Sequence, residues 1–214
     1  MDYINKSLFT EKQNRYLEQL IDRIKSVMPP SLFAHTLGTL KFSCKLADRH
    51  LLEAGKSKIN TFFKLCVSSI LHDYGKMFTY EQLVTAAREN NLGLTDFEMG
   101  CKPIVHSFVG DYLVARDYNI NDHEILRAIK YHTIGCMNMS ILEKILFISD
   151  KIEETRNYDG IDRLRDLAFE DLDLCLLEVY KNNIIYNVSR EHMLHPDTSL
   201  IWNNICGGKK NDFQ

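Results

Sequence analysis

The stretch Leu71-His72-Asp73-Tyr74-Gly75-Lys76 organises the rest of the chain, because it places a histidine, an aspartate and a lysine directly after an apolar run. Neighbouring residues of a helix point about 100° apart, so His72 and Asp73 can hold a metal ion between them. Lys76 follows His72 by one turn, and Gly75 is expected to adopt a left-handed conformation that ends the helix. A buried charged pair costs free energy unless it is paired or binds a metal, so the stretch predicts an interior site.

The composition is that of an ordinary globular protein. A chain of 214 residues can bury a sizeable core, as one large domain or two small ones. A hydrophobic fraction of 45% and a charged fraction of 26% are typical of soluble domains. The net charge of −3 gives no support for a nucleic-acid coat or a polybasic membrane anchor, but it is compatible with a local basic pocket for phosphates.

The cysteines and the start of the chain indicate a reducing compartment. The six cysteines form no Cys-x-x-Cys pair, which argues against a zinc ribbon or a redox motif. The first twenty residues are polar and charged, unlike a secretory signal. No apolar run approaches the roughly 18 residues of a membrane-spanning helix. We therefore expect a cytoplasmic protein with neither a membrane nor a nucleic acid as partner.

Helix signals recur along the chain, whereas alternating strand patterns are scarce. Capping-box patterns begin at Thr10, Thr79, Thr95 and Ser140. Apolar spacing and breakers predict helices over 10–27, 32–54, 60–74, 79–89, 95–102, 104–116, 121–132, 140–150, 164–188 and 198–205. The predicted fold is all-α, a single compact multi-helix domain over residues 1–206 with its core at about 31–160. Residues 207–214 are expected to form a disordered tail.

Six residues with metal-binding side chains lie in apolar helical settings: His35, His72, Asp73, His106, His132 and Asp150. Successive gaps of 37, 33, 26 and 18 residues are too long for a local metal motif, so the fold must bring them together. Any one of the histidines alone is more often a hydrogen-bonded core or surface residue, and a lone aspartate is as often a helix cap. The ordered series, rather than any single member, favours a metal site.

The series and its flanking segments resemble the HD-domain metal-dependent phosphohydrolases, and in particular the YqeK-type symmetrical bis(5'-nucleosyl)-tetraphosphatases. The resemblance spans residues 32 to 204. The matching segments are 71–76, 128–135, 139–145, 149–156, 164–168 and 195–198. The chain departs from the family where Leu32 replaces an expected arginine and Ser149 an expected alanine.

The resemblance implies a ligand set that consists of His35, His72, Asp73, His106, His132 and Asp150. Six ligands exceed the need of a tetrahedral zinc site and suit two octahedral ions. Asp73 is expected to bridge them, with His35, His72 and Asp150 on one ion and His106 and His132 on the other. The cofactors implied are two divalent or trivalent transition-metal ions. The resemblance points to iron, and manganese or another metal is the alternative.

The implied reaction is the cleavage of diadenosine tetraphosphate into two ADP by a hydroxide held between the ions. Asp73 and Lys76 are the predicted catalytic residues, and Lys76, Thr133 and Arg156 the predicted substrate contacts. Lys76 reads equally well as a solvated helix-end lysine, and Arg156 as a cation favoured by a helix C-terminus. Thr133 is at least as readily a turn residue. Lys151 could face phosphate or water.

Other groups are expected to be structural. Glu153 and Glu154 read as a solvated face, while His192 and His195 stand outside the series. The apolar stripe of Leu172, Leu176, Val179 and Tyr180 reads as core or as the face of a homodimer. No short motif marks a nucleobase pocket.

Two rival functions remain at the level of the sequence. One is another HD-type nucleotide phosphohydrolase or phosphodiesterase, although the chain has no Gly-Tyr-Pro motif of the phosphodiesterases that carry it. The other is a non-catalytic module that senses nucleotides. The presence of all six candidate ligands argues against a site that has lost its activity.

Overall fold

A computed structural model describes residues 4–51 and 58–207, and these residues contain helices but no strand. The α-helices are α1 (Glu11–Val27), α2 (Pro30–His50), α3 (Ile59–Leu71), α4 (Tyr80–Glu89), α5 (Asp96–Gly100), α6 (Lys102–Tyr118), α7 (His123–Tyr131), α8 (Ile141–Ile152), α9 (Ile161–Glu170), α10 (Leu172–Ser189) and α11 (Thr198–Gly207). Two short 3₁₀ turns, η1 (Lys6–Leu8) and η4 (Tyr74–Met77), complete the described elements. The predicted all-α class is confirmed. The predicted tail, apart from Gly207, and positions 52–54 of the second predicted helix lie outside the described residues.

The four predicted capping boxes are confirmed. Thr10, Thr79, Thr95 and Ser140 each accept a hydrogen bond from the backbone N–H three residues later, and the side chain at that position bonds back to the cap. These reciprocal bonds satisfy backbone groups that a helix N-terminus otherwise leaves unpaired. Local sequence therefore fixes where α1, α4, α5 and α8 begin.

The long helix predicted over 164–188 is wrong. The chain breaks at Asp171, whose backbone is extended (φ −144°, ψ 101°) and whose carboxylate accepts the N–H of Leu174 at 2.8 Å. Aspartate competes with helix continuation by capping the next helix. The apolar periodicity continues across the break, which is why spacing alone did not reveal it.

The conformation predicted for Gly75 is also wrong. Helix α3 ends at Leu71, and Gly75 lies within η4 without a positive φ. A Cβ at this position would overlap the carbonyl oxygen of His106 and lie 2.9 Å from its carbon. The glycine is thus required by the close approach of η4 to α6, and not by a helix terminus.

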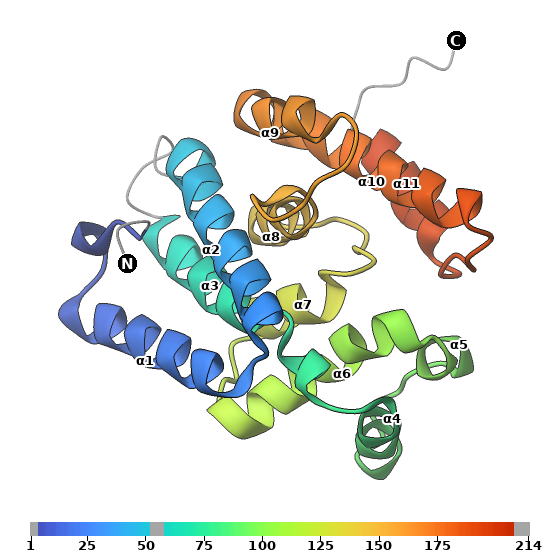
Figure 1. Ribbon diagram of the computed structural model, residues 1–214, viewed down its shortest axis with the longest axis horizontal. Coiled ribbons are helices and arrows are strands. Elements are labelled where there is room, and N and C mark those ends of the chain that lie inside the picture. Colours follow the sequence, from blue (N-terminus) through green and yellow to red (C-terminus); the bar gives the residue numbers. More distant parts are fainter. Residues whose placement is uncertain (1–3, 52–57, 208–214) are drawn as a thin grey trace.

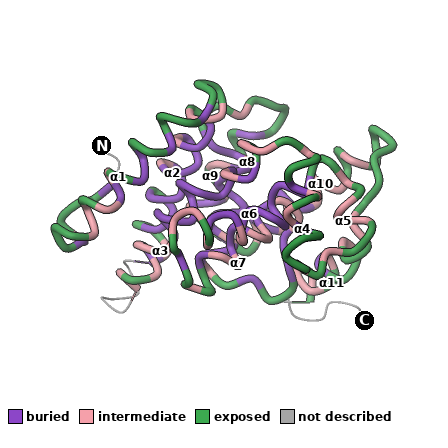
Figure 2. The backbone as a smooth tube through the Cα atoms, turned by 90° about the horizontal axis from the view of Figure 1, so that it is seen from below, coloured by how far each residue is buried: buried purple, intermediate pink, exposed green. Residues whose placement is uncertain are grey.

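The core helices pack around α8, which runs nearly end-on through the view of Figure 1. Helices α2 and α3 pack on α8 from one side and α10 from the other, while α7 contacts α3, α6 and α8. Helix α4 lies on α6 over a small apolar cluster of its own. Figure 2 shows buried residues concentrated where these helices meet. The packing brings the C-terminal ends of α3 and α7 to the middle of the molecule.

The apolar stripe of α10 belongs to the core. Leu172, Leu176, Val179 and Tyr180 are all buried within the chain, so they do not form a dimer face. All six cysteines are described and none forms a disulfide. None of the helices in the described part is long and apolar enough to cross a membrane. The assignment of residues 1–206 to one domain, with its core at about 31–160, stays a prediction.

Candidate metal centre

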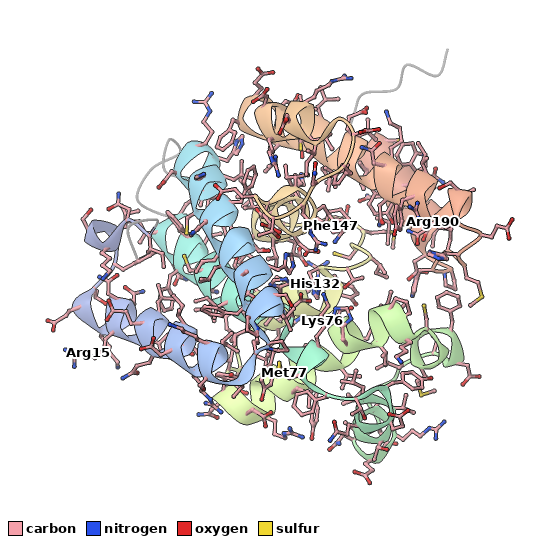
Figure 3. The ribbon with its side chains drawn as sticks, viewed as in Figure 1. Arg15, Lys76, Met77, His132, Phe147 and Arg190 are labelled. Atoms are coloured by element: carbon pink, nitrogen blue, oxygen red, sulfur yellow. The ribbon has the colours of Figure 1, made fainter. Side chains whose placement is uncertain are left out.

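The structure brings all six predicted ligands together in the interior. His35 comes from α2, His72 and Asp73 from the junction of α3 and η4, His106 from α6, His132 from the end of α7 and Asp150 from α8. All six are buried. Ligand atoms lie within 4.8 Å of one another in two groups that share His72: His35, His72 and Asp150, and His72, Asp73 and His132. Figure 3 shows His132 at the centre of the molecule, near Lys76.

Asp73 lies between the histidines and presents a different oxygen to each pair. Its Oδ1 is 3.4 Å from Nε2 of both His106 and His132. Its Oδ2 is 3.5 Å from Nε2 of His35 and 3.4 Å from Nε2 of His72. One carboxylate therefore faces two sets of nitrogen donors, which is the geometry expected of a bridging ligand.

The backbone fixes how two of the imidazoles point. Nδ1 of His72 donates to the Ser69 carbonyl at 2.9 Å, and Nδ1 of His132 donates to the Ile129 carbonyl at 2.7 Å. With Nδ1–H committed to a carbonyl, Nε2 carries a lone pair and faces the cluster. Metal-binding histidines are commonly held in this way.

Unpartnered atoms at the centre fit a cation. Among the described residues, Asp73 Oδ1 and His106 Nε2 are buried and have no hydrogen-bond partner. Buried polar atoms without partners are costly, and a metal ion would satisfy both. Imidazole and carboxylate donors suit first-row transition metals better than calcium, which prefers oxygen ligands alone. The residues present thus fit a transition-metal centre.

The electrostatics favour the protonation states that bind metals. Burial raises the pKa of Asp73, but the surrounding imidazoles of His72, His106 and His132 outweigh it and hold the pKa well below its usual range. Burial lowers the pKa of His132 to about 4. At neutral pH the carboxylate is therefore ionised and this imidazole is neutral, as metal ligation requires.

Three cations surround the two aspartates. Lys76 Nζ lies 2.7 Å from Asp73 Oδ2, and Lys151 Nζ lies 2.6 Å from Asp150 Oδ2. Arg156 Nη2 lies 3.2 Å from Asp150 Oδ1, and its Nε donates to the Asp150 carbonyl, so the helix-end contact expected as its alternative role is present. Both Lys76 and Arg156 are more than a third exposed, so they reach solvent as well as the carboxylates.

A cavity of about 580 Å³ opens from the ligands to solvent. Lys76, Thr133 and Arg156 line it together with His106, His132 and Asp150. In this structure the hydroxyl of Thr133 lies 3.1 Å from Nε2 of His132. A smaller cavity of about 190 Å³ shares Pro103, Thr133, Lys151, Asn183 and Tyr186 with the first and runs beside α10.

The outer wall of the cavity contains residues that the sequence did not predict. Tyr158, Asn182 and Tyr186 line it, and Tyr186 is 52% exposed. The Asn182 side chain makes no hydrogen bond to any other described residue. No short motif in the sequence marks this wall, because its α10 residues reach the cavity through the packing of α10 on α8.

The predictions for Glu153, Glu154 and His195 have different outcomes. The solvated face predicted for Glu153 and Glu154 is wrong for Glu153, which is fully buried and bonded to His35, whereas Glu154 is exposed and pairs with Lys45. Sequence spacing missed this because Glu153 follows the last turn of α8 and turns inward. His195 stacks on Phe108 and lines the smaller cavity, and it is not among the residues that line the cavity at the predicted ligands.

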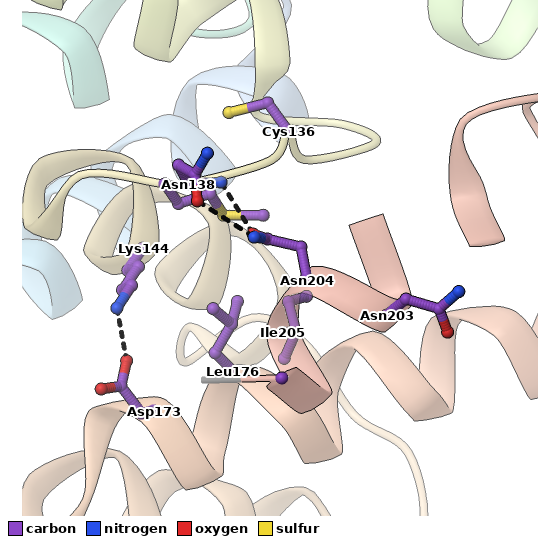
Figure 4. A pocket seen from close by; sticks show the side chains of 10 residues that line it. Cys136, Asn138, Lys144, Asp173, Leu176, Asn203, Asn204 and Ile205 are labelled. Atoms are coloured by element: carbon purple, nitrogen blue, oxygen red, sulfur yellow. Dashed lines mark hydrogen bonds and ion pairs between the residues drawn. The ribbon is translucent and has the colours of Figure 1, made fainter. Parts of the chain in front are cut away.

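A cavity of about 720 Å³ lies elsewhere and contains none of the predicted ligands. Figure 4 shows its walls, where Lys144 pairs with Asp173 and Asn138 and Asn204 bond to each other. Its polar groups are thus largely satisfied by one another. The side chains that can bind a metal or a phosphate line the cavity of about 580 Å³ instead.

A helical fold that gathers a His-Asp doublet, three further histidines and a late aspartate defines an HD-type domain, and residues 32–155 match the HD domain family. A crystal structure of a predicted HD superfamily hydrolase involved in NAD metabolism from Clostridium acetobutylicum superposes with a TM-score of 0.80. It is 27% identical and is matched over 90% of this chain and 97% of that one.

Curated relatives narrow the family. The chain is 31% identical to the symmetrical bis(5'-nucleosyl)-tetraphosphatase of Bacillus subtilis, covering 89% of this chain and 98% of the relative. It is 30% identical to the enzyme of that name from Staphylococcus aureus, covering 81% and 86%. The chain therefore belongs to the HD-domain family and, within it, to the symmetrical bis(5'-nucleosyl)-tetraphosphatases.

Proposed function

We propose that this protein hydrolyses diadenosine tetraphosphate symmetrically into two ADP, in a metal-dependent reaction. The observation that carries the proposal is Asp73, whose two oxygens face separate pairs of buried histidines at the end of an open cavity. The relatives that cover nearly the whole chain act, by their names, on bis(5'-nucleosyl) tetraphosphates. The geometry of the site and the similarity to these relatives therefore support the same reaction.

The proposed cofactors are two transition-metal ions, with iron as the first candidate and manganese as the alternative. His35, His72 and Asp150 would hold one ion, His106 and His132 the other, and Asp73 would contact both. When bound, such ions lower the pKa of water and neutralise negative charge that develops on a phosphate. The buried nitrogens and carboxylates support the metal class, and the choice of iron rests on resemblance alone.

The cationic side chains would bind the phosphates. Lys76 offers a compact charge beside Asp73, and Arg156 offers a planar group that can hold two phosphate oxygens at once. Because both reach the cavity as well as the aspartates, they can move from carboxylate to phosphate when substrate enters. Thr133 is a further proposed donor, once its hydroxyl leaves His132.

The cavity also provides space for a nucleoside. Symmetrical cleavage requires the central anhydride at the ligands, so two phosphates and a nucleoside must extend along the wall formed by Tyr158, Asn182 and Tyr186. Six free thiols fit a reducing compartment, which supports the proposed cytoplasmic location. A homodimer stays a prediction.

Product analysis tests the proposal. The metal-loaded protein is incubated with diadenosine tetraphosphate, and the nucleotides are separated by ion-exchange chromatography. ADP alone is expected, with no reaction after chelation of the metal. ATP plus AMP would contradict symmetrical cleavage, and no turnover with metal bound would favour a nucleotide sensor. NAD⁺, assayed in parallel, tests the alternative suggested by the name of the structural relative.

A further inference from the structure

Glu153 is a buried carboxylate placed directly behind the ligand His35. It follows the last residue of α8 and is fully buried. Its Oε1 accepts the Nδ1–H of His35 at 3.0 Å, and its Oε2 accepts the backbone N–H of Thr155 at 2.6 Å. The hydroxyl of Thr155 donates to Oε1 as well. Both carboxylate oxygens are thus engaged, and one of them holds a metal-binding imidazole.

This arrangement distinguishes His35 from the other oriented histidines. His72 and His132 direct Nδ1 at backbone carbonyls, whereas His35 directs it at a carboxylate. A carboxylate that accepts the Nδ1–H fixes the tautomer of the imidazole. It also makes Nε2 a stronger metal ligand than a carbonyl at the same position would. His35 Nε2, the remaining donor atom, points to Asp150 Oδ1 at 2.9 Å.

Gly38 provides the space for this carboxylate. It lies one turn after His35 on α2, at a mid-helix position where glycine is unfavourable compared with alanine. A Cβ there would overlap Oε2 of Glu153 and lie 2.8 Å from its Cδ. The atoms that would be displaced are the end of a flexible side chain, so an alanine would move the carboxylate rather than break the helix. The glycine and the glutamate therefore form one structural unit.

We propose that Glu153 is a positioning residue for the metal site of His35, His72 and Asp150, and that Gly38 holds open the space it needs. Glu153 acts through His35 and touches neither substrate nor ion. The inference rests on the proposed function only in requiring that this cluster binds a metal. Loss of Glu153 would weaken the metal position at His35, His72 and Asp150 and spare the one at His106 and His132. The two metal positions are therefore unequal.

The test is a titration of the metal-free protein with Mn²⁺ in competition with a chelator. Glu153→Gln preserves size but replaces one accepting oxygen with an N–H group, which cannot accept from the donors around it. Gly38→Ala keeps the glutamate and displaces it. Both should weaken one of two Mn²⁺ positions about 10- to 100-fold. Glu154→Gln, the exposed neighbour paired with Lys45, is the matched control and should bind Mn²⁺ like the unmodified protein. Variants that match the unmodified protein would overturn the inference.

A double-mutant cycle separates positioning from a general structural role. If Glu153 acts through His35, then Glu153→Gln should add no further loss of Mn²⁺ affinity in a His35→Ala background. Independent, additive losses would overturn the inference. So would failure of both Glu153→Gln and Gly38→Ala to fold, judged by far-UV circular dichroism of the metal-free proteins, because the pair would then be structural.

The same titration distinguishes failure of the inference from failure of the proposed function. If the unmodified protein binds no Mn²⁺, the metal centre itself is absent and both fall. If it binds Mn²⁺ and the two variants bind it equally well, the metal centre stands and only the role of Glu153 is lost.

Discussion

The two walls of the central cavity differ in how firmly their side chains are held. On the inner wall, the predicted ligands His72 and His132 are buried, and each has its Nδ1 bonded to the backbone. On the outer wall, Tyr186 is half exposed and the amide of Asn182 bonds to no described residue. The inner wall is arranged before any substrate arrives, whereas the outer wall can adapt to one. Substitutions on the inner wall should therefore affect kcat, and those on the outer wall KM.

Asp73→Ala should have the largest effect. It removes the only side chain among the described residues that faces both pairs of histidines, so the ions lose their shared ligand. We expect kcat for diadenosine tetraphosphate to fall on the order of 10³-fold or more. Asp162→Ala, at an exposed position of α9, is the control and should leave kcat unchanged. Steady-state kinetics at saturating metal make the comparison, and a variant that keeps full activity contradicts the bridging role.

Lys76→Ala should have the next largest effect. A hydrogen bond to a charged group contributes about 1.5–3 kcal/mol, so the loss of a phosphate contact should lower kcat/KM roughly 10- to 100-fold. Lys12→Ala, on the exposed face of α1, is the control. If Lys76 serves only to pair with Asp73, kcat/KM will instead stay near its original value, and the phosphate role will be lost.

Gly75→Ala tests how tightly the inner wall is built. The new Cβ meets the backbone of His106, which cannot move aside as a side chain can. Overpacking of this kind costs about 1–3 kcal/mol, so the free energy of unfolding should fall by that amount. Gly100→Ala, where a Cβ meets nothing, is the control. Urea denaturation measures both, and equal stabilities would show that η4 and α6 are not rigidly packed.

Tyr186→Ala should have the smallest effect. Loss of an aromatic surface for a nucleobase costs about 1 kcal/mol or more, so KM should rise severalfold while kcat is maintained. Val188→Ala, equally exposed but outside the cavity, is the control. A fall in kcat without a change in KM would remove the distinction between the two walls.

Features that depend on local sequence could be predicted, whereas those that depend on tertiary contacts could not. Helix starts at Thr10 and Ser140 follow from local capping, and the ligands followed from an ordered series that resembles a family. The bend at Asp171 and the buried state of Glu153 could not be predicted, because each depends on a contact that apolar spacing does not encode. Asn182 and Tyr186 reach the cavity only because α10 packs on α8, a tertiary contact without a sequence signature.

Anomalous diffraction from a crystal of the metal-loaded protein, collected at the absorption edge of the bound metal, tests the central claim most directly. We expect two peaks, one on each side of Asp73: one beside His35, His72 and Asp150, and the other beside His106 and His132. A single peak, or peaks away from Asp73, would contradict the two-metal centre.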